Sequence, residues 1–303
     1  MYIIKRFLKF IEITTKIASF VPFLIGLAYV FYLQGRIDVF YSAFFAVDIM
    51  LFDLPVTMIN NYLDKRRSGE SPHFSKMVSL TLIISMTSLS ILMGLYLTYV
   101  FGPIILFTGI LCFFTGIFYS ATPICLSRTP YGEIFSGLVQ GFCITFMIVF
   151  INLPKGYLVD LQFANEFMQL QVNMLNMIRL VLVTLPAVFC ISAIMLANNI
   201  CDVERDTKVN RFTLPYYIGK DLALKIYRLL YIGVYAVIYA AIFVKALPLL
   251  FCGLMFVTLP FVMKNVTAFT KKPEKSTTFI LSLKNFILIL IPYMIAIFLG
   301  RLV

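Results

Sequence analysis

Long apolar stretches alternate with short polar connections along the whole chain of 303 residues. Most of these stretches run for about 20 residues, the length that an α-helix needs to cross a hydrocarbon layer of ~30 Å. Continuous apolar runs favour helices, because membrane β-strands show short alternating segments. We therefore expect an all-α polytopic membrane protein with about nine transmembrane helices around a central cavity. The expected spans are residues 15–34, 38–60, 77–99, 101–121, 132–152, 178–200, 224–244, 246–264 and 278–300.

The polar connections are too short for a separate soluble domain, so we expect one membrane domain over residues 1–303. Residues 1–14 mix isoleucine and phenylalanine with lysine and arginine, which is typical of a short helix lying on the membrane surface. The polar stretch around Phe167 to Met177 is expected to be an external loop, helical at the interface.

Basic residues predict the orientation of the chain, because cytoplasmic loops carry an excess of lysine and arginine. With the N-terminus in the cytoplasm, nineteen basic residues lie inside and five outside, with Lys284 set aside within the last span. We therefore expect a cytoplasmic N-terminus in a multi-pass protein of the cell membrane.

The composition narrows the possible classes of protein. Charged residues make up 13% of the chain and hydrophobic residues 61%, against about 25% charged residues in soluble proteins. The excess of lysine and arginine over acidic residues is explained by topology, so we expect no nucleic-acid partner. His73 is the only histidine, and the six cysteines are scattered without a CxxC pair. Zinc sites and histidine-based catalysis are therefore disfavoured.

A polar cluster closes the apolar run that ends near residue 200. Asn198, Asp202 and Asp206 are spaced by four residues, which places them on one face of a helix. Carboxylates at a membrane boundary are costly to desolvate and are functional by default. Their oxygens suit a hard cation such as Mg2+, which usually binds together with phosphate. Lys208 and Arg211 follow closely and are candidates to bind phosphate oxygens.

A second polar segment closes the run that ends near residue 60. Asp53, Thr57, Asn60 or Asn61, and Asp64 recur at helical spacing. Such a stripe faces the interior of a bundle or a water-filled cavity. One interpretation is a structural hydrogen-bond network between helices. The other is half of a metal–pyrophosphate site shared with the first cluster. Two further charged residues follow, Arg67 and Glu70.

A third candidate segment, Phe118 to Gly141, connects the fourth and fifth expected spans. Its Tyr119 offers a ring face to a cation, and Arg128 offers a contact to an anion. The alternatives are an interfacial aromatic residue and an arginine placed by the positive-inside rule.

At these residues the chain resembles the UbiA superfamily of intramembrane prenyltransferases, most closely the branch that acts on 1,4-dihydroxy-2-naphthoate in menaquinone synthesis. The second motif of that branch is matched by Asn198, Asn199, Asp202, Asp206, Arg211, Thr213, Leu214 and Gly219. The first motif departs from the family at Asn61, where an aspartate is usual. Glu70 aligns with a later acidic position, and Asn61 retains a neutral oxygen ligand.

The resemblance implies transfer of a polyprenyl group from polyprenyl diphosphate to an aromatic acceptor in the lipid bilayer, with an active site that opens to the cytoplasm. It implies two Mg2+ ions held by Asn60, Asn61, Asp64, Glu70, Asn198, Asp202 and Asp206. Catalytic roles fall to Asp64, Asp202, Asp206 and Tyr119. The pyrophosphate would be bound by Arg67, Arg128, Lys208 and Arg211. Asp53 and Asn199 are candidates for the acceptor or for proton transfer.

Other functions remain open at this stage. Within the family, 4-hydroxybenzoate, haem or a lipid alcohol are alternative acceptors, and Asn61 is compatible with a catalytically weakened paralogue. An ion-coupled transporter also builds cation sites from intramembrane aspartate and asparagine. It would place them near the bilayer midplane, whereas the acidic residues here cluster at one predicted face. Neither prenyl chain length nor oligomeric state follows from the sequence.

Overall fold

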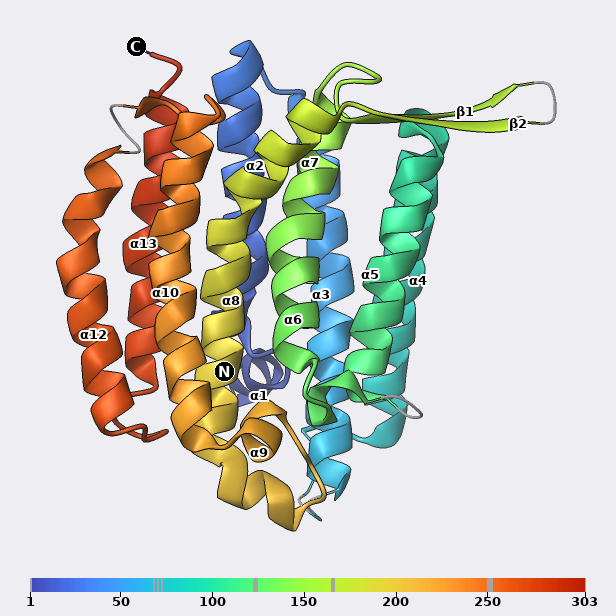
Figure 1. The fold of residues 1–303 in the computed structure, drawn as a ribbon. Coiled ribbons are helices and arrows are strands. Elements are labelled where there is room, and N and C mark those ends of the chain that lie inside the picture. The colour runs from blue at the N-terminus through green and yellow to red at the C-terminus, as the bar shows by residue number, and fades with distance from the viewer. Residues whose placement is uncertain are drawn as a thin grey trace. The chain divides into compact units, whose positions relative to one another are not determined.

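The computed structural model describes residues 2–67, 69, 71, 73–121, 125–164, 167–249 and 253–302. In this part of the chain the structure is helical except for one two-stranded hairpin (Figure 1). The expected class, an all-α polytopic membrane protein, is confirmed. The chain divides into two compact units, each described by itself below. Unit 1 comprises Met1–Phe20 and Asp38–Leu126, and unit 2 comprises Val21–Ile37 and Ser127–Val303.

Unit 1 is built on three long helices that follow one another in the chain. Helix α3 packs against both α4 and α5. It accommodates Pro55 in its interior. The connection between α4 and α5 is the single residue Gly102, whose φ of 97° is readily adopted only by glycine. The helical segments of the unit are α1 (Tyr2–Phe10), η1 (Ile13–Lys16), the first turn of α2 (Ile17–Gln34), α3 (Val39–Arg67), α4 (Lys76–Phe101) and α5 (Pro103–Ser120).

The N-terminal helix α1 is held against α3 and α4 by apolar packing. Phe10 and Ile11 are buried in a cluster with Met58 of α3 and Ile83 of α4. Burying such side chains stabilises a contact by about 1.5–3 kcal/mol each. This cluster holds the end of α1 beside Met58, which lies among the polar residues Asp53 to Asp64 of α3.

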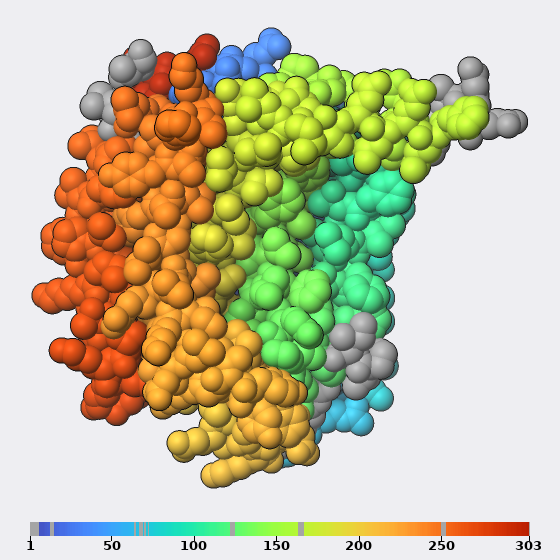
Figure 2. All heavy atoms as spheres, in the orientation of Figure 1, coloured from blue at the N-terminus to red at the C-terminus, as the bar shows by residue number. Residues whose placement is uncertain are grey.

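Unit 2 is organised around α8, which contacts α6, η3, α10 and α13. Small residues such as Ala187, Ala193 and Ala197 are fully buried along α8 and allow these neighbours to approach. In the space-filling view, side chains close the space between the ribbons of α10 and α12 (Figure 2). The helical segments that follow α2 are η2 (Leu126–Arg128), α6 (Gly132–Ser136), η3 (Gly137–Cys143), α7 (Ile144–Asn152), α8 (Met174–Lys208), α9 (Leu214–Ile218), α10 (Lys220–Phe243), η4 (Leu254–Thr258), α12 (Leu259–Lys271) and α13 (Ile280–Leu299).

A close helix–helix contact in unit 2 involves the segment η3, which is a π-helix between α6 and α7. Gly137 and Gly141 lie four residues apart, the small-xxx-small pattern of packed membrane helices. A Cβ added at Gly141 would lie 2.7 Å from the backbone nitrogen and 2.8 Å from the Cα of Val188 in α8. The two backbones therefore meet with no room for a side chain.

In the described part of the chain, eight helices are long and apolar enough to cross a membrane, and they correspond to eight of the nine expected spans. The remaining expected span, residues 246–264, contains residues 250–252, which lie outside the described part of the chain. The described residues after this gap include η4 and α12. The cytoplasmic position of the N-terminus stays a prediction.

One expectation is wrong in part, because residues 167–172 form a strand and not an interfacial helix. Strand β2 (Phe167–Val172) pairs antiparallel with β1 (Val159–Ala164), so that Leu161 lies opposite Leu170. The hairpin projects from the ends of α7 and α8 (Figures 1 and 2). Met168, Leu170 and Val172 alternate with polar residues, a period of two that is typical of strands. Helix α8 begins at Met174.

The close approach at Gly141 predicts the effect of one added methyl group. Gly141→Ala should lower the stability of the protein by about 1–3 kcal/mol, because backbone atoms of α8 cannot move aside as a side chain can. Gly109→Ala is the control, because a Cβ at Gly109 meets no atom within 4 Å. It should leave stability unchanged or raise it by up to about 1 kcal/mol. Thermal unfolding in detergent would measure both, and equal effects would contradict the packing described.

Candidate functional site

The C-terminal third of α8 carries the polar column predicted from the sequence. Helix α8 is continuous to Lys208, so Asn198, Asp202 and Asp206 follow one another on consecutive turns. Their environments differ. Asn198 and Asp202 are partly exposed, whereas Asp206 is buried.

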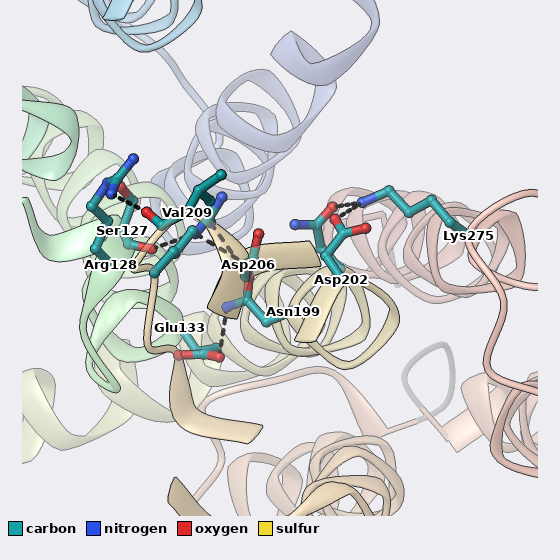
Figure 3. A network of polar contacts seen from close by, with 10 residues as sticks. Ser127, Arg128, Glu133, Asn199, Asp202, Asp206, Val209 and Lys275 are labelled. Atoms are coloured by element: carbon teal, nitrogen blue, oxygen red, sulfur yellow. Dashed lines mark hydrogen bonds and ion pairs between the residues drawn. The ribbon is translucent and has the colours of Figure 1, made fainter. Parts of the chain in front are cut away.

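Lys275, in the connection between α12 and α13, binds the first two residues of this column (Figure 3). Its Nζ donates to Oδ2 of Asp202 at 2.7 Å and to Oδ1 of Asn198. The Asp202 side chain is 17% exposed and that of Lys275 is 44% exposed. One cation therefore already bridges a carboxylate and an amide oxygen that the sequence predicted to be metal ligands. Lys275 itself was counted in the sequence only as a topological lysine.

Asp206, the third residue of the column, pairs with Arg211 (Figure 3). Its Oδ2 lies 3.4 Å from Nε of Arg211. The backbone N–H groups of Arg211 and Val209 donate to the Asp206 carbonyl at 2.9 and 3.0 Å. The chain thus turns back immediately after α8. This turn places the guanidinium of Arg211, two residues beyond Val209, beside the Asp206 carboxylate.

Arg211 connects the end of α8 with the segment before α6. Its Nε donates to the carbonyl of Ser127 at 3.0 Å, and Nη2 donates to Oδ1 of Asn199 at 3.5 Å. Arg128 makes a parallel contact, donating from Nη1 to the carbonyl of Val209 at 3.0 Å. Both arginines, predicted to bind pyrophosphate, therefore also bind the protein backbone. Lys208 is exposed at the last residue of α8.

Glu133 is the member of this network that sequence reasoning left without a role. Its side chain is 4% exposed. Oε1 accepts from Nδ2 of Asn199 at 2.8 Å, and Oε2 has no hydrogen-bond partner among the described residues. Ser192 of α8 donates to the Glu133 carbonyl at 3.0 Å. A charged residue in an otherwise apolar span, directly after Gly132, was the available signal.

Asn199, predicted for the acceptor or proton transfer, is buried between Glu133 and Arg211. Its amide donates to the carboxylate and accepts from the guanidinium, because an amide side chain carries both a donor and an acceptor. This geometry favours a positioning role that holds Arg211 in place.

Unit 1 contains the second predicted segment, in which Asp53 is engaged on both oxygens. Oδ1 lies 3.1 Å from Nζ of Lys16, and Oδ2 accepts from Ser19 at 2.9 Å. Lys16 is 4% exposed and also donates to Thr57. A buried ion pair with further hydrogen bonds is costly to break from either side. For Asp53, the structure favours the interpretation of a hydrogen-bond network between helices.

The two asparagines of this segment make different contacts. Oδ1 of Asn60 accepts from Ser120 of α5 at 2.7 Å. Nδ2 of Asn61 donates to the carbonyl of Phe10, the last residue of α1, at 2.9 Å. An aspartate at position 61 would have no hydrogen to donate. The departure from the family pattern thus has a structural explanation, because the amide binds the end of α1.

The remaining predicted residues are placed only in part. Tyr119 lies in the last turn of α5, next to Ser120. Asp64 and Arg67 lie in α3, and their side chains lie outside the described part of the structure. Glu70 lies outside the described residues. Among the described residues, no group of three or more histidine, cysteine, aspartate or glutamate side chains forms a metal-binding cluster. The fit for a cation rests on Asn198 and Asp202, whose hard oxygens already bind the Lys275 ammonium.

The contact of Asn61 with α1 yields a prediction with a matched control. Asn61→Asp should weaken the attachment of α1 by about 1–3 kcal/mol, because the Phe10 carbonyl loses its donor. Asn60→Asp adds the same charge one residue away but can still accept from Ser120. Hydrogen exchange of the α1 amides should therefore quicken in the first variant and not in the second. Equal exchange in both would exclude this role for Asn61.

Comparisons with known proteins agree with the sequence motifs. The UbiA prenyltransferase family matches residues 19–289. The chain is 25% identical over 218 residues to a 1,4-dihydroxy-2-naphthoate octaprenyltransferase of Bacillus subtilis (strain 168). That alignment covers 68% of this chain and 63% of the relative, so the chain spans less than two thirds of the relative's length.

Solved structures of the same fold cover nearly the whole chain. A UbiA homolog from Archaeoglobus fulgidus bound to GPP and Mg2+ has a TM-score of 0.61 at 15% identity, covering 97% of this chain and 99% of the homolog. A digeranylgeranylglyceryl phosphate synthase has a TM-score of 0.65 at 15% identity, covering 98% and 99%. At these identities the likeness shows the fold alone. Because the family match extends over most of the sequence, the chain belongs to the UbiA prenyltransferase family.

Proposed function

We propose that the protein transfers a polyprenyl group from polyprenyl diphosphate to 1,4-dihydroxy-2-naphthoate, with Mg2+ as cofactor and loss of the acceptor's carboxylate as CO2. The observation that carries the proposal is the polar column of α8, where Asn198 and Asp202 already hold a cation. Family membership and the acceptor in the name of the Bacillus subtilis relative support it. The A. fulgidus homolog bound to GPP and Mg2+ supports the diphosphate and the metal.

We assign the metal-holding role to Asn198, Asp202 and Asp206 in unit 2 and to Asn60, Asp64 and Glu70 in unit 1. When bound there, Mg2+ would neutralise the negative charge of the diphosphate as the leaving group departs. Asn61 has its amide nitrogen bound to Phe10, which leaves its carbonyl oxygen for a ligand. Arg67, Lys208 and Arg128 are assigned to the diphosphate.

The chain's own residues keep the column in place during the reaction. Arg211 is bound by Ser127 and Asn199, and it fixes the orientation of the Asp206 carboxylate. Glu133 in turn orients Asn199. Such preorganised charges cost no reorganisation when the transition state forms. We therefore assign Glu133, Asn199 and Arg211 to positioning Asp206.

The bond changes of the proposed reaction are simple. The allylic C–O bond breaks and the pyrophosphate leaves with the electron pair. The ring carbon that carries the carboxylate attacks the allylic carbon. The bond from that carbon to the carboxylate then breaks, CO2 leaves, and the electron pair restores the aromatic ring. Tyr119 offers a ring face to the allylic cation. Apolar helices exclude the water that would quench it. Both oxygens of Asp53 are engaged, so we assign to Asp64 the proton that an acceptor hydroxyl gives up during the attack and regains when CO2 has left.

The reaction can be tested with protein in nanodiscs, Mg2+, radiolabelled geranyl diphosphate and either dihydroxynaphthoate or 4-hydroxybenzoate. Prenylated naphthoate should form and should need Mg2+. Asp202→Asn should lower the rate at least ~100-fold, because it removes a charge that stabilises the transition state. Asp221→Asn, an equal change at an exposed residue of α10, should not. Turnover of 4-hydroxybenzoate alone would overturn the acceptor, and no product with either would overturn the activity.

We further propose that the N-terminus and the C-terminal end of α8 face the cytoplasm of a cell membrane, as the basic residues predict. The thiol of the variant Lys155→Cys, between α7 and β1, should react in intact cells with a membrane-impermeant maleimide. The thiol of the variant Lys271→Cys, at the end of α12, should react only after the cells are opened. Both native side chains are exposed, so accessibility within the protein does not limit either reaction. The reverse pattern would invert the proposed topology.

A further inference from the structure

The ammonium of Lys275 lies where a metal ion would have to bind on α8. It contacts Oδ2 of Asp202 at 2.7 Å and Oδ1 of Asn198. These two oxygens lie one helical turn apart and face the same cation (Figure 3). A divalent ion that used both oxygens would meet the ammonium at contact distance, and two cations on one carboxylate oxygen repel each other. Lys275 and a metal ion therefore cannot hold both ligands together.

The backbone that carries Lys275 is held by a dense set of local contacts. Oγ1 of Thr278 donates to the carbonyls of Lys272 at 2.6 Å and Glu274 at 3.2 Å, and accepts from the Glu274 N–H at 3.0 Å. Glu274 also accepts from Thr277 at 2.9 Å and pairs with Lys272 at 3.2 Å. These contacts, the Thr277 hydroxyl foremost, lower the pKa of Glu274. The connection is thus fixed, and its Lys275 side chain is the part that can move.

The Lys275 side chain has the properties of an exchangeable ligand. It is 44% exposed, and half-exposed ion pairs contribute only about 1 kcal/mol or less to stability. In the same position its ammonium lies 4.8 Å from the ring centroid of Phe279, a contact that adds a weak cation–π attraction. The four-carbon stem of lysine allows the charge to change partner without a change in the backbone.

We propose that Lys275 is an internal counter-cation that holds Asn198 and Asp202 together until metal and diphosphate bind, and then moves its ammonium to the phosphate oxygens. The inference rests on the proposed function. It adds a residue from the connection between α12 and α13 to the site. The Lys275 ammonium thus has two successive partners, first Asn198 and Asp202 and then the phosphate oxygens of the diphosphate.

The inference predicts opposite effects on two ligands. Lys275→Met keeps the apolar stem and removes the charge. Mn2+ alone should bind this variant roughly five- to tenfold more tightly than the unaltered protein, because no ammonium competes for Asp202. With Mn2+ at saturation, inorganic pyrophosphate should bind it more weakly by a similar factor. Electron paramagnetic resonance of free Mn2+ in detergent measures the first affinity, and calorimetry measures the second.

Matched variants separate the outcomes. Lys271→Met removes the same charge from an exposed position four residues earlier and should change neither affinity. If Lys275→Met changes only the melting temperature, Lys275 is merely structural and the inference is overturned. If Asp202→Asn does not weaken Mn2+ binding, the metal site is wrong and the proposed function fails together with the inference. If Asp202→Asn weakens it while Lys275→Met leaves it unchanged, the inference alone fails.

Discussion

A carboxylate taken out of water is stable only if charges or hydrogen bonds compensate for its lost hydration, and this requirement governs the end of α8. Unit 2 buries Asp206 and Glu133 within one network. Arg211 supplies the positive charge beside Asp206. Asn199 lies between the guanidinium and Glu133, accepting a hydrogen bond from the first and donating one to the second. Removing one member of a buried pair costs about 3–5 kcal/mol. Arg211 therefore connects the turn after α8 and the segment before α6 with the Asp206 carboxylate.

Unit 1 meets the same requirement in a different way. Asp53 is paired with the buried Lys16, the last residue of η1. Asn61 binds the carbonyl at the end of α1. Both contacts hold the N-terminal segment against α3, so this polar stripe is largely used for structure. The polar residues of α8 are used differently, since among the described residues Asn198 and Asp202 bind a lysine that is itself half-exposed.

The exposure of the partner distinguishes side chains used for structure from side chains that a ligand can reach. A ligand must compete with the contacts that a side chain already makes. Glu133 and Lys16, the partner of Asp53, are buried, whereas Lys275, the partner of Asp202, has a side chain that is 44% exposed. The positive charge of Lys275 beside Asp202 also limits the cost of removing this carboxylate from water.

The amino-acid sequence by itself determined the helical membrane class, eight of the spans and the polar column of α8, because helical periodicity and span length are local properties. It did not reveal the hairpin of β1 and β2, where Met168, Leu170 and Val172 follow the period of a strand. Only the tertiary structure decided which lysines pair with Asp202 and Asp53. Lys275 lies 73 residues from Asp202, and Lys16 lies 37 from the backbone of Asp53. A charge pair between distant segments leaves no local pattern in the sequence, because it forms only when the fold brings those segments together.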